Sequence, residues 1–339
     1  HWVDQSSGQF LEYFCQSLED YPIILILVAR DFGKFGLAQS LREAAEKHIR
    51  KAHIIQIQPL EAADAQYLVD QLIAEESPTA QELKENIAAR AGGNPYYTEE
   101  LVRILIDHGG FVVQDENWQV TEEALSLIEE IPGTLGDIIL ARFDHLPEPQ
   151  QQVLLKASII GDTFSVQLLK VLEGETGTLI SESLRELEER DFLIHTRFEV
   201  DEGYIFKHPL LQETIYRTIL KRDRQRLHTQ AAEAIERGDF WLPGERNQVL
   251  AHHLSKGEKP EKAIPYLLIS AQEAYQHGAN DTVIQLYNRA LDLMDSTAYT
   301  QIVDRERALV GLAQALKFTG ELDEAAGILT KIVERIPPK

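Results

Sequence analysis

Residues 308–337 read ALVGLAQALKFTGELDEAAGILTKIVERIP, and this stretch sets the expected fold class. Its apolar residues recur three and four positions apart on both sides of Gly320, which predicts two helices joined by a tight turn. Alanines allow the two helices to approach closely, and Pro337 ends the second helix. An earlier stretch has matching offsets, marked by Leu267, Ala271, Ala274, Gly278, Tyr287 and Ala290. The C-terminal third is therefore expected to be a repeated, all-helical array.

This spacing is the tetratricopeptide pattern, in which helix hairpins stack into a superhelix. The 308–337 copy fits the pattern well, whereas the earlier copy has Val283 where a small residue is usual. Residues 224–256 are expected to form a degenerate, earlier helix pair. We assign residues 223–339 to the array. Stacked hairpins leave a concave face, and we expect that face to bind a protein partner.

The middle of the chain predicts two further helical regions. In residues 61–134, a Gly92-Gly93-Asn94-Pro95 break separates helices that end near residues 91 and 106, and a short hairpin follows from Phe111. In residues 135–222, helices are expected at 135–144, 149–160, 165–172, 179–190 and 210–220, with strands at 192–196 and 204–206. Helices closed by a two-stranded wing make a winged-helix arrangement.

The first sixty residues carry a different pattern. The all-apolar run from Ile23 to Val28 predicts a strand covered on both faces, as in a parallel sheet. A helix is expected at 37–49 and a second strand at 53–58. Because two parallel strands do not make a stable sheet, we expect the rest of that sheet to precede residue 1. The fold class is thus mainly α, with the remnant of a parallel α/β domain in residues 1–60.

Composition limits the functions that this chain can have. Its 339 residues carry a formal net charge of −22, which opposes general attraction to nucleic acid or to an anionic membrane. No apolar stretch is long enough to cross a bilayer. The one cysteine, Cys15, is expected to be a small core residue. A single cysteine cannot form a disulfide within the chain, which suits a reducing compartment. These features predict a cytoplasmic protein with no membrane contact.

Several catalytic and binding motifs are missing from the sequence. It has no Gly-x-x-x-x-Gly-Lys-Ser/Thr phosphate loop, no Gly-x-Gly-x-x-Gly, no Gly-x-Ser-x-Gly and no paired Cys-x-x-Cys. His252 and His253 are adjacent, so on a helix they point about 100° apart and lack the spacing of a metal pair. The presumptive recognition helix of the winged-helix region, 178–190, has four acids against two arginines, which disfavours DNA contact.

A set of short motifs in a fixed order nevertheless resembles one family. These motifs are His1-Trp2-Val3-Asp4, Arg30-Asp31, Gln58-Pro59-Leu60, Gly93-Asn94-Pro95-Tyr96-Tyr97 with Glu99-Glu100-Leu101, Ile131-Pro132-Gly133-Thr134-Leu135, and Phe206-Lys207-His208-Pro209-Leu210 with Gln212-Glu213 and Tyr216. Together they resemble the signal-transduction ATPases with numerous domains, the STAND class of P-loop nucleotide triphosphatases. The subset most similar is the bacterial module found beside class III adenylate cyclases, protein kinases and LuxR-type regulators.

The resemblance implies roles for particular residues, and each has a structural alternative. Arg30 matches a sensor arginine that reports a γ-phosphate, or it is a surface arginine at a strand end. Asn94 and Pro95 match a step that borders the adenine, or they simply start a helix. His208 matches a histidine that contacts the diphosphate of ADP, or it caps a helix N-terminus. Asp4 matches a position near the hydrolytic water, or it caps a helix.

The resemblance also implies a function and an architecture. Residues 1–60 would end an ATPase domain, 61–134 would be its helical lid, 135–222 a winged helix and 223–339 the sensing repeats. The parent protein would bind ATP or ADP with Mg²⁺ and regulate an output domain. This chain would neither bind nucleotide tightly nor hydrolyse ATP, because the Walker A and Walker B residues are missing. The alternatives are a protein-binding scaffold with a decayed ATPase remnant and a LuxR-type transcriptional regulator.

Overall fold

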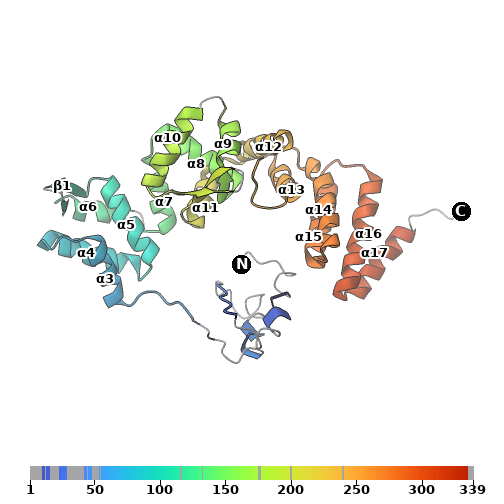
Figure 1. The fold of residues 1–339 in the computed structure, drawn as a ribbon, viewed down its shortest axis with the longest axis horizontal. Helices are drawn as coiled ribbons and strands as arrows, with labels where there is room; N and C mark the ends of the chain where they lie inside the picture. Colours follow the sequence, from blue (N-terminus) through green and yellow to red (C-terminus); the bar gives the residue numbers. More distant parts are fainter. Residues whose placement is uncertain are drawn as a thin grey trace. The chain divides into compact units, whose positions relative to one another are not determined.

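The computed structural model describes residues 10–11, 13–15, 23–28, 42–43, 45–47, 53, 55–114, 117–131, 133–174, 177–198, 201–238 and 240–334. Over these residues the chain is mainly helical, as the sequence predicts (Figure 1). Contacts divide it into two compact units, one formed by residues 57–243 and the other by residues 1–56 with 244–339.

The first part of the 57–243 unit is a helical cluster with one hairpin. It consists of α3 (Ala62–Leu72), α4 (Pro78–Ala91), α5 (Pro95–Asp107), β1 (Phe111–Gln114), β2 (Asn117–Val120) and α6 (Ala124–Glu130). Strands β1 and β2 pair antiparallel. The core of this cluster is made of fully buried aliphatic side chains, among them Val69, Leu83, Ile87 and Leu101. Ile138 joins the same core, so the helix that follows also packs on this cluster.

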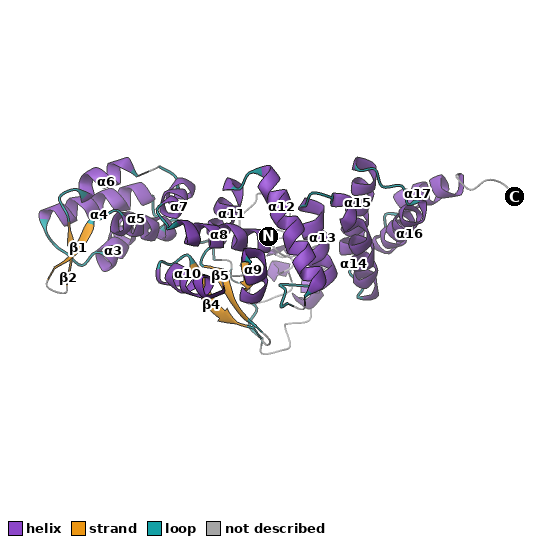
Figure 2. Cartoon of the chain, turned by 90° about the horizontal axis from the view of Figure 1, so that it is seen from above, coloured by secondary structure: helices purple, strands orange, loops and turns teal. Residues whose placement is uncertain are grey.

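That next helix begins a second group in the same unit. This group contains α7 (Leu135–Asp144), α8 (Glu148–Ile160), β3 (Thr163–Ser165), α9 (Val166–Glu173), α10 (Gly177–Glu189), β4 (Leu193–Arg197), β5 (Glu202–Phe206) and α11 (Pro209–Thr218). The strands form an antiparallel sheet in the order β3-β5-β4, seen in orange beside α9 and α10 in Figure 2. The sequence predicted the β4–β5 hairpin but not β3, which is too short to show periodicity.

Helix α12 (Lys221–Arg237) packs against α8 and α9, and therefore belongs with this group. Leu227 of α12 lies in a buried cluster with Ile159 and Ile219. The sequence pattern had placed residues 224–256 together as an early repeat pair. In the structure α12 instead belongs to the 57–243 unit, because its apolar face packs against α8 and α9.

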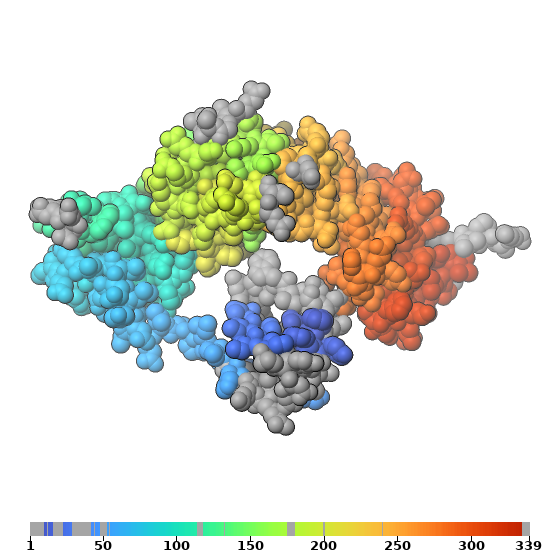
Figure 3. Space-filling view, viewed as in Figure 1, coloured from blue at the N-terminus to red at the C-terminus, as the bar shows by residue number. Residues whose placement is uncertain are grey.

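The 244–339 part of the other unit contains α13 (Arg246–Lys256), the short helix η2 (Pro260–Ala263), α14 (Ile264–Gln276), α15 (Asn280–Ser296), α16 (Ile302–Thr319) and α17 (Leu322–Glu334). Each helix from α14 onward packs on the next, and α14 also contacts α16. The atoms of these helices make up the orange and red parts of the space-filling view in Figure 3. At the α15–α16 contact, the Tyr287 ring packs so closely on Gly311 that a Cβ there would lie 2.4 Å from it.

Residues 23–28 differ from the expectation. They are not in a strand, and five of the six side chains are exposed, with Ile24 at 90% and Val28 at 87%. The described residues at 55–58 are likewise not in a strand. The expected covered strands are therefore not formed here. No described strand pairs with either segment, and a strand needs neighbours to satisfy its backbone.

Among the described residues, the 37–49 segment, Cys15 and the lengths of the apolar helices agree with the sequence. The described residues of the 37–49 segment, 42–43 and 45–47, are helical. Cys15 is fully buried, as expected for a core residue. In the part of the chain that the structure describes, no helix combines the length and apolar character needed to cross a bilayer.

Candidate functional site

The turn between α4 and α5 is held in one conformation by two glycines. Gly92 and Gly93 have φ angles of 59° and 75°, a region in which residues with a Cβ are strained. A Cβ on Gly93 would lie 2.4 Å from the carbonyl oxygen of Leu60, and the Leu60 amide donates to the Gly93 carbonyl at 2.8 Å. The turn is thereby fastened to the segment that leads into α3, which fixes where α5 begins.

Asn94 and Pro95 start α5 from this turn. The Asn94 side chain is the N-cap, and its Oδ1 accepts from the amides of Tyr96 and Tyr97 at 3.1 and 3.3 Å. Pro95 occupies the first helical turn, where its missing N–H costs nothing. The helix-start alternative for these two residues is therefore confirmed. Both residues are exposed, so the cap leaves them accessible to a ligand.

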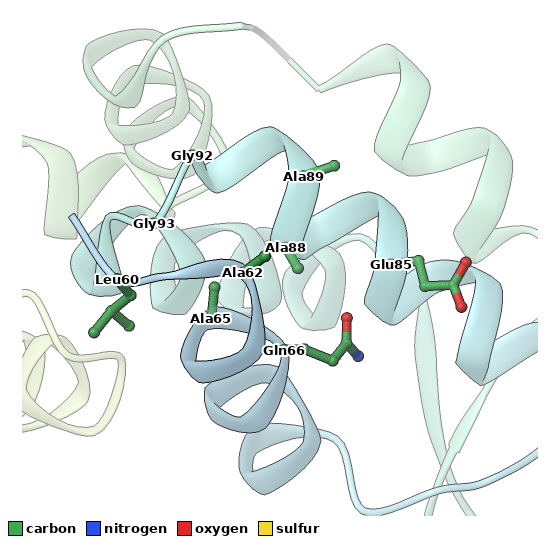
Figure 4. Close-up of a pocket in the computed structure, with 9 residues that line it drawn as sticks. All are labelled: Leu60, Ala62, Ala65, Gln66, Glu85, Ala88, Ala89, Gly92 and Gly93. Carbon is green, nitrogen blue, oxygen red and sulfur yellow. The ribbon is translucent and has the colours of Figure 1, made fainter.

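A cavity of about 400 Å³ borders the same glycine turn. It lies between α3 and α4, and Figure 4 shows Ala62, Ala65 and Ala88 close together between the two helices. Leu60 and the two glycines lie at one end, and Gln66 and Glu85 lie toward the other (Figure 4). Because most of the lining side chains are methyl groups or hydrogens, the cavity suits a flat, largely apolar group with a polar edge.

His208 is placed by the hairpin that ends at Phe206. It is the N-cap of α11, and its Nδ1 accepts from the Leu210 amide at 3.2 Å. An imidazole nitrogen that accepts has no proton, so a neutral His208 carries its proton on Nε2. The helix-capping alternative for His208 is thus confirmed as well.

The structure brings the two candidate segments together. The ring of Tyr96, which directly follows Asn94 and Pro95, stacks on the ring of His208 with 4.1 Å between centroids and 9° between planes. The N-termini of α5 and α11 therefore meet, and neither helix has an acidic residue in its first turn. Helix N-termini carry partial positive charge, whereas the Glu100 carboxylate of α5 contributes negative charge at Tyr96.

A buried ionic network lies beneath this junction. Glu100 is fully buried on α5 and forms ion pairs with Arg142 on α7 and with Arg103. Arg142 is 2% exposed, donates to the Arg190 carbonyl at 2.7 Å and lies 4.6 Å from the centre of the Phe192 ring. One guanidinium thus ties α5, α7 and the start of the hairpin together.

Asp191 extends the network toward His208. Its φ angle of 62° is unusual for a residue with a side chain, and its carboxylate pairs with both Arg103 and Lys207. Tyr96 lies one helical turn before Glu100. Burial raises the pKa of the Tyr96 hydroxyl well above its ordinary value, and the Glu100 carboxylate raises it further. Tyr96 therefore stays neutral beside His208.

Part of this arrangement is predicted by the sequence. The segments of Asn94, Pro95 and His208 are joined through the stacking of Tyr96 on His208, whereas Arg30 and Asp4 lie outside the described residues. Among the described residues, no group of three or more His, Cys, Asp or Glu side chains could hold a metal ion.

Four residues of the arrangement were given no role by the sequence pattern, namely Tyr96, Glu100, Arg142 and Asp191. Tyr96 and Glu100 are four positions apart, so helical spacing alone could have placed them on one face. Nothing in the sequence indicated that Arg142 and Asp191 join them, because those contacts arise only when separate elements pack together.

No family model matches this chain. A protein of Rhizobium meliloti (strain 1021), named only as uncharacterized, is 24% identical to it over 298 residues, which cover 86% of the chain. The matched region is 27% of that protein's length, so the chain spans about a quarter of its relative.

Proposed function

We propose that this chain is the lid, winged-helix and sensor part of a nucleotide-switched bacterial signalling ATPase that acts in the cytoplasm. In this proposal residues 61–134 form the lid, 135–222 the winged helix and the helices after it a tetratricopeptide-like sensor. The observation that carries the proposal is the stacking of Tyr96 on His208. The resemblance gives nucleotide contacts to the segments on both sides of this stack, and those segments meet where α5 and α11 begin.

The residues present fit an adenine nucleotide in three respects. The cavity beside Gly93 is lined by small side chains, as a purine ring would need. The Nε2–H of His208 is the donor that a phosphate oxygen requires, and two acid-free helix N-termini lie beside it. Asn94 and Pro95 are exposed and lie in the chain between Gly93, which lines the cavity, and Tyr96, which stacks on His208. The nucleotide would supply the phosphate charge that the switch reads.

The buried network explains how such a contact could act at a distance. Arg142 connects α5 to the hairpin, so a movement of either segment changes the contacts of the other. With ADP held by His208, the lid and winged helix would stay together. Exchange for ATP would release them and alter what the sensor helices present. Hydrolysis requires a phosphate loop, and the 339 residues contain no Gly-x-x-x-x-Gly-Lys-Ser/Thr motif.

The test uses a polypeptide that carries this chain together with a phosphate loop. We expect His208→Ala to weaken ADP binding by about tenfold or more, because one charge-assisted hydrogen bond is lost. ATP binding should weaken less. The matched control is His195→Ala, which removes an exposed imidazole on β4 of the same group. Equal ADP affinity of the His208→Ala variant and the parent, measured by titration calorimetry, would contradict the proposal.

A second candidate is a protein-binding scaffold in which nucleotide plays no part. The observation that favours it is the exposed apolar surface of α14 and α16, described below, which depends on no nucleotide. Partner binding that persists unchanged in the presence of ATP, ADP or neither would support the scaffold over the switch.

A further inference from the structure

Two helices of the 244–339 part share a face that is unlike the rest of this acidic chain. We call it the α14–α16 face. On α16 its members are Val303, Arg307, Val310, Gln314, Lys317 and Phe318, whose spacing places them on one side of the helix. On α14 its members are Ile269, Gln272, Tyr275 and Gln276. The two helices contact each other directly, which brings the two sets of residues side by side.

Contacts between the two helices hold this face together. The Tyr275 and Phe318 rings meet edge to face with 6.2 Å between centroids, and Arg307 donates to the Gln272 side chain. The apolar members are nevertheless open to solvent, with Val303 at 74%, Phe318 at 65% and Tyr275 at 40% exposure. A clustered set of exposed large apolar side chains marks a binding surface far more often than isolated ones do.

The charge on this face is the reverse of that on the molecule. The chain has a net charge of −22, yet the face carries Arg307 and Lys317, with one carboxylate, that of Glu306, at its edge. Glu306 is exposed and lies about 20° around α16 from Lys317. The other two acids of these helices have partners elsewhere, because Glu273 accepts from Asn247 and Asp304 accepts from Tyr299.

We propose that the α14–α16 face binds a peptide segment of a partner protein that combines apolar side chains with carboxylates. The exposed rings and valines would bury the apolar side chains, and Arg307 and Lys317 would pair with the carboxylates. A basic segment would gain no charge pairing here, and the glutamines of the face give polar partners for an extended backbone. This deepens the sensing half of the proposed function, on which it rests only for the biological role of the partner.

The test starts from the complete 339-residue chain without nucleotide. A displayed library of random peptides is selected on this chain, and the Phe318→Ser chain serves as the subtractive step. We expect the selected peptides to be acidic and to contain aromatic or branched aliphatic residues. Their dissociation constants are then measured by fluorescence anisotropy against matched surface variants.

The variants form two pairs that differ only in location. Val303→Ser and Lys317→Gln alter the face, whereas Val333→Ser and Lys331→Gln alter exposed positions on α17. We expect each face variant to weaken binding about five- to tenfold and each α17 variant by less than about twofold. All four positions are exposed, and unchanged circular dichroism would confirm that the variants fold.

Three results would overturn this inference. They are the selection of basic peptides, equal loss of binding in the face and α17 variants, and failure to select any peptide that distinguishes the parent from Phe318→Ser. Because no nucleotide is present, these results are independent of the His208 experiment. A failed ADP test with intact peptide binding would leave the α14–α16 face in place as the surface of a scaffold.

Discussion

Glu100 and Arg142 form an ion pair with almost no solvent contact. The net contribution of such a buried pair to the free energy of folding is small, but the loss of one partner is costly. Two charges removed from water are costly, and their attraction repays that cost only when both are present and hydrogen-bonded. Arg142 meets this condition through Glu100, Asp107 and the Arg190 carbonyl. The pair therefore defines one arrangement of α5 and α7 more than it adds net stability.

The first prediction concerns Arg142→Met, which leaves Glu100 charged, buried and without its main partner. We expect the free energy of unfolding to fall by about 3–5 kcal/mol. The control is Arg185→Met, which removes the ion pair to Glu189 between side chains that are 62% and 61% exposed. That change should cost about 0.5 kcal/mol or less. Urea unfolding followed by circular dichroism measures both, and similar losses would show that the Glu100–Arg142 pair is not special.

The second prediction concerns His252 on α13 and the dependence of stability on pH. Part of its side chain is exposed, yet the protein around its ring and the nearby cations Lys256 and Arg289 lower its pKa from 6.5 to about 4. As the pH falls from about 6.5 toward 4, His252 takes up a proton in the unfolded chain but not in the folded chain. Stability should therefore be complete above about pH 6.5 and should decline toward pH 4.

The measurement is the thermal midpoint from neutral pH down to about pH 4 for the parent chain and for His252→Gln. We expect a shallower decline in His252→Gln, because the variant has no proton to take up at this position. His277→Gln, at the exposed end of α14, serves as the control and should follow the parent. A parallel decline in all three proteins would exclude His252 as a source of the acid sensitivity.

At the scale of elements, the α4–α5 turn decides where the candidate site lies. Its two glycines both have positive φ, but only Gly93 approaches another backbone segment closely. A Cβ on Gly92 would have no heavy atom within 4 Å apart from its chain neighbours. A side chain at Gly92 would therefore meet only backbone strain, whereas a side chain at Gly93 would also clash with Leu60.

The third prediction compares the same substitution at these two positions. Gly92→Ala should cost about 1 kcal/mol, the usual penalty for a left-handed residue with a Cβ. Gly93→Ala should cost about 1–3 kcal/mol more, because its methyl group would displace Leu60 from the turn. Denaturant unfolding measures the difference. Equal costs would mean that the contact between Gly93 and Leu60 does not constrain the turn.

At the scale of the whole molecule, the chain has two compact units with separate interiors. Leu83 is fully buried in the 57–243 unit, and Leu312 is 4% exposed on α16 of the other unit. Separate cores allow each unit to unfold on its own. Under the proposed function, this independence would let the 244–339 helices respond to a partner while residues 61–222 respond to nucleotide.

The fourth prediction tests whether the two units unfold separately. Calorimetry of the complete chain should show two transitions. Leu83→Ala should lower one of them and Leu312→Ala the other, because each substitution removes about 2–5 kcal/mol from a different core. If both variants lower a single shared transition to the same extent, then the units unfold together and the proposed division of roles loses its physical basis.

Helix positions could be predicted well from the sequence, because helical periodicity reflects contacts within a few residues. The predicted helix at 135–144 has the same bounds as α7, and the hairpin before His208 lies where it was expected. The strands expected at 23–28 and 53–58 are not formed in the described residues there, since a strand depends on neighbours that local sequence cannot supply. Strand β3 was missed because three residues carry no measurable period.

Local sequence was enough to specify that this protein is mainly helical, that a hairpin precedes His208 and that Asn94 and Pro95 start a helix. Each of these depends on side chains close together along the chain. Packing between elements was needed to stack Tyr96 on His208, to pair Arg142 with Glu100 and to join α12 to the 57–243 unit. Those contacts link residues far apart in the sequence, so they leave no periodic signal in the chain.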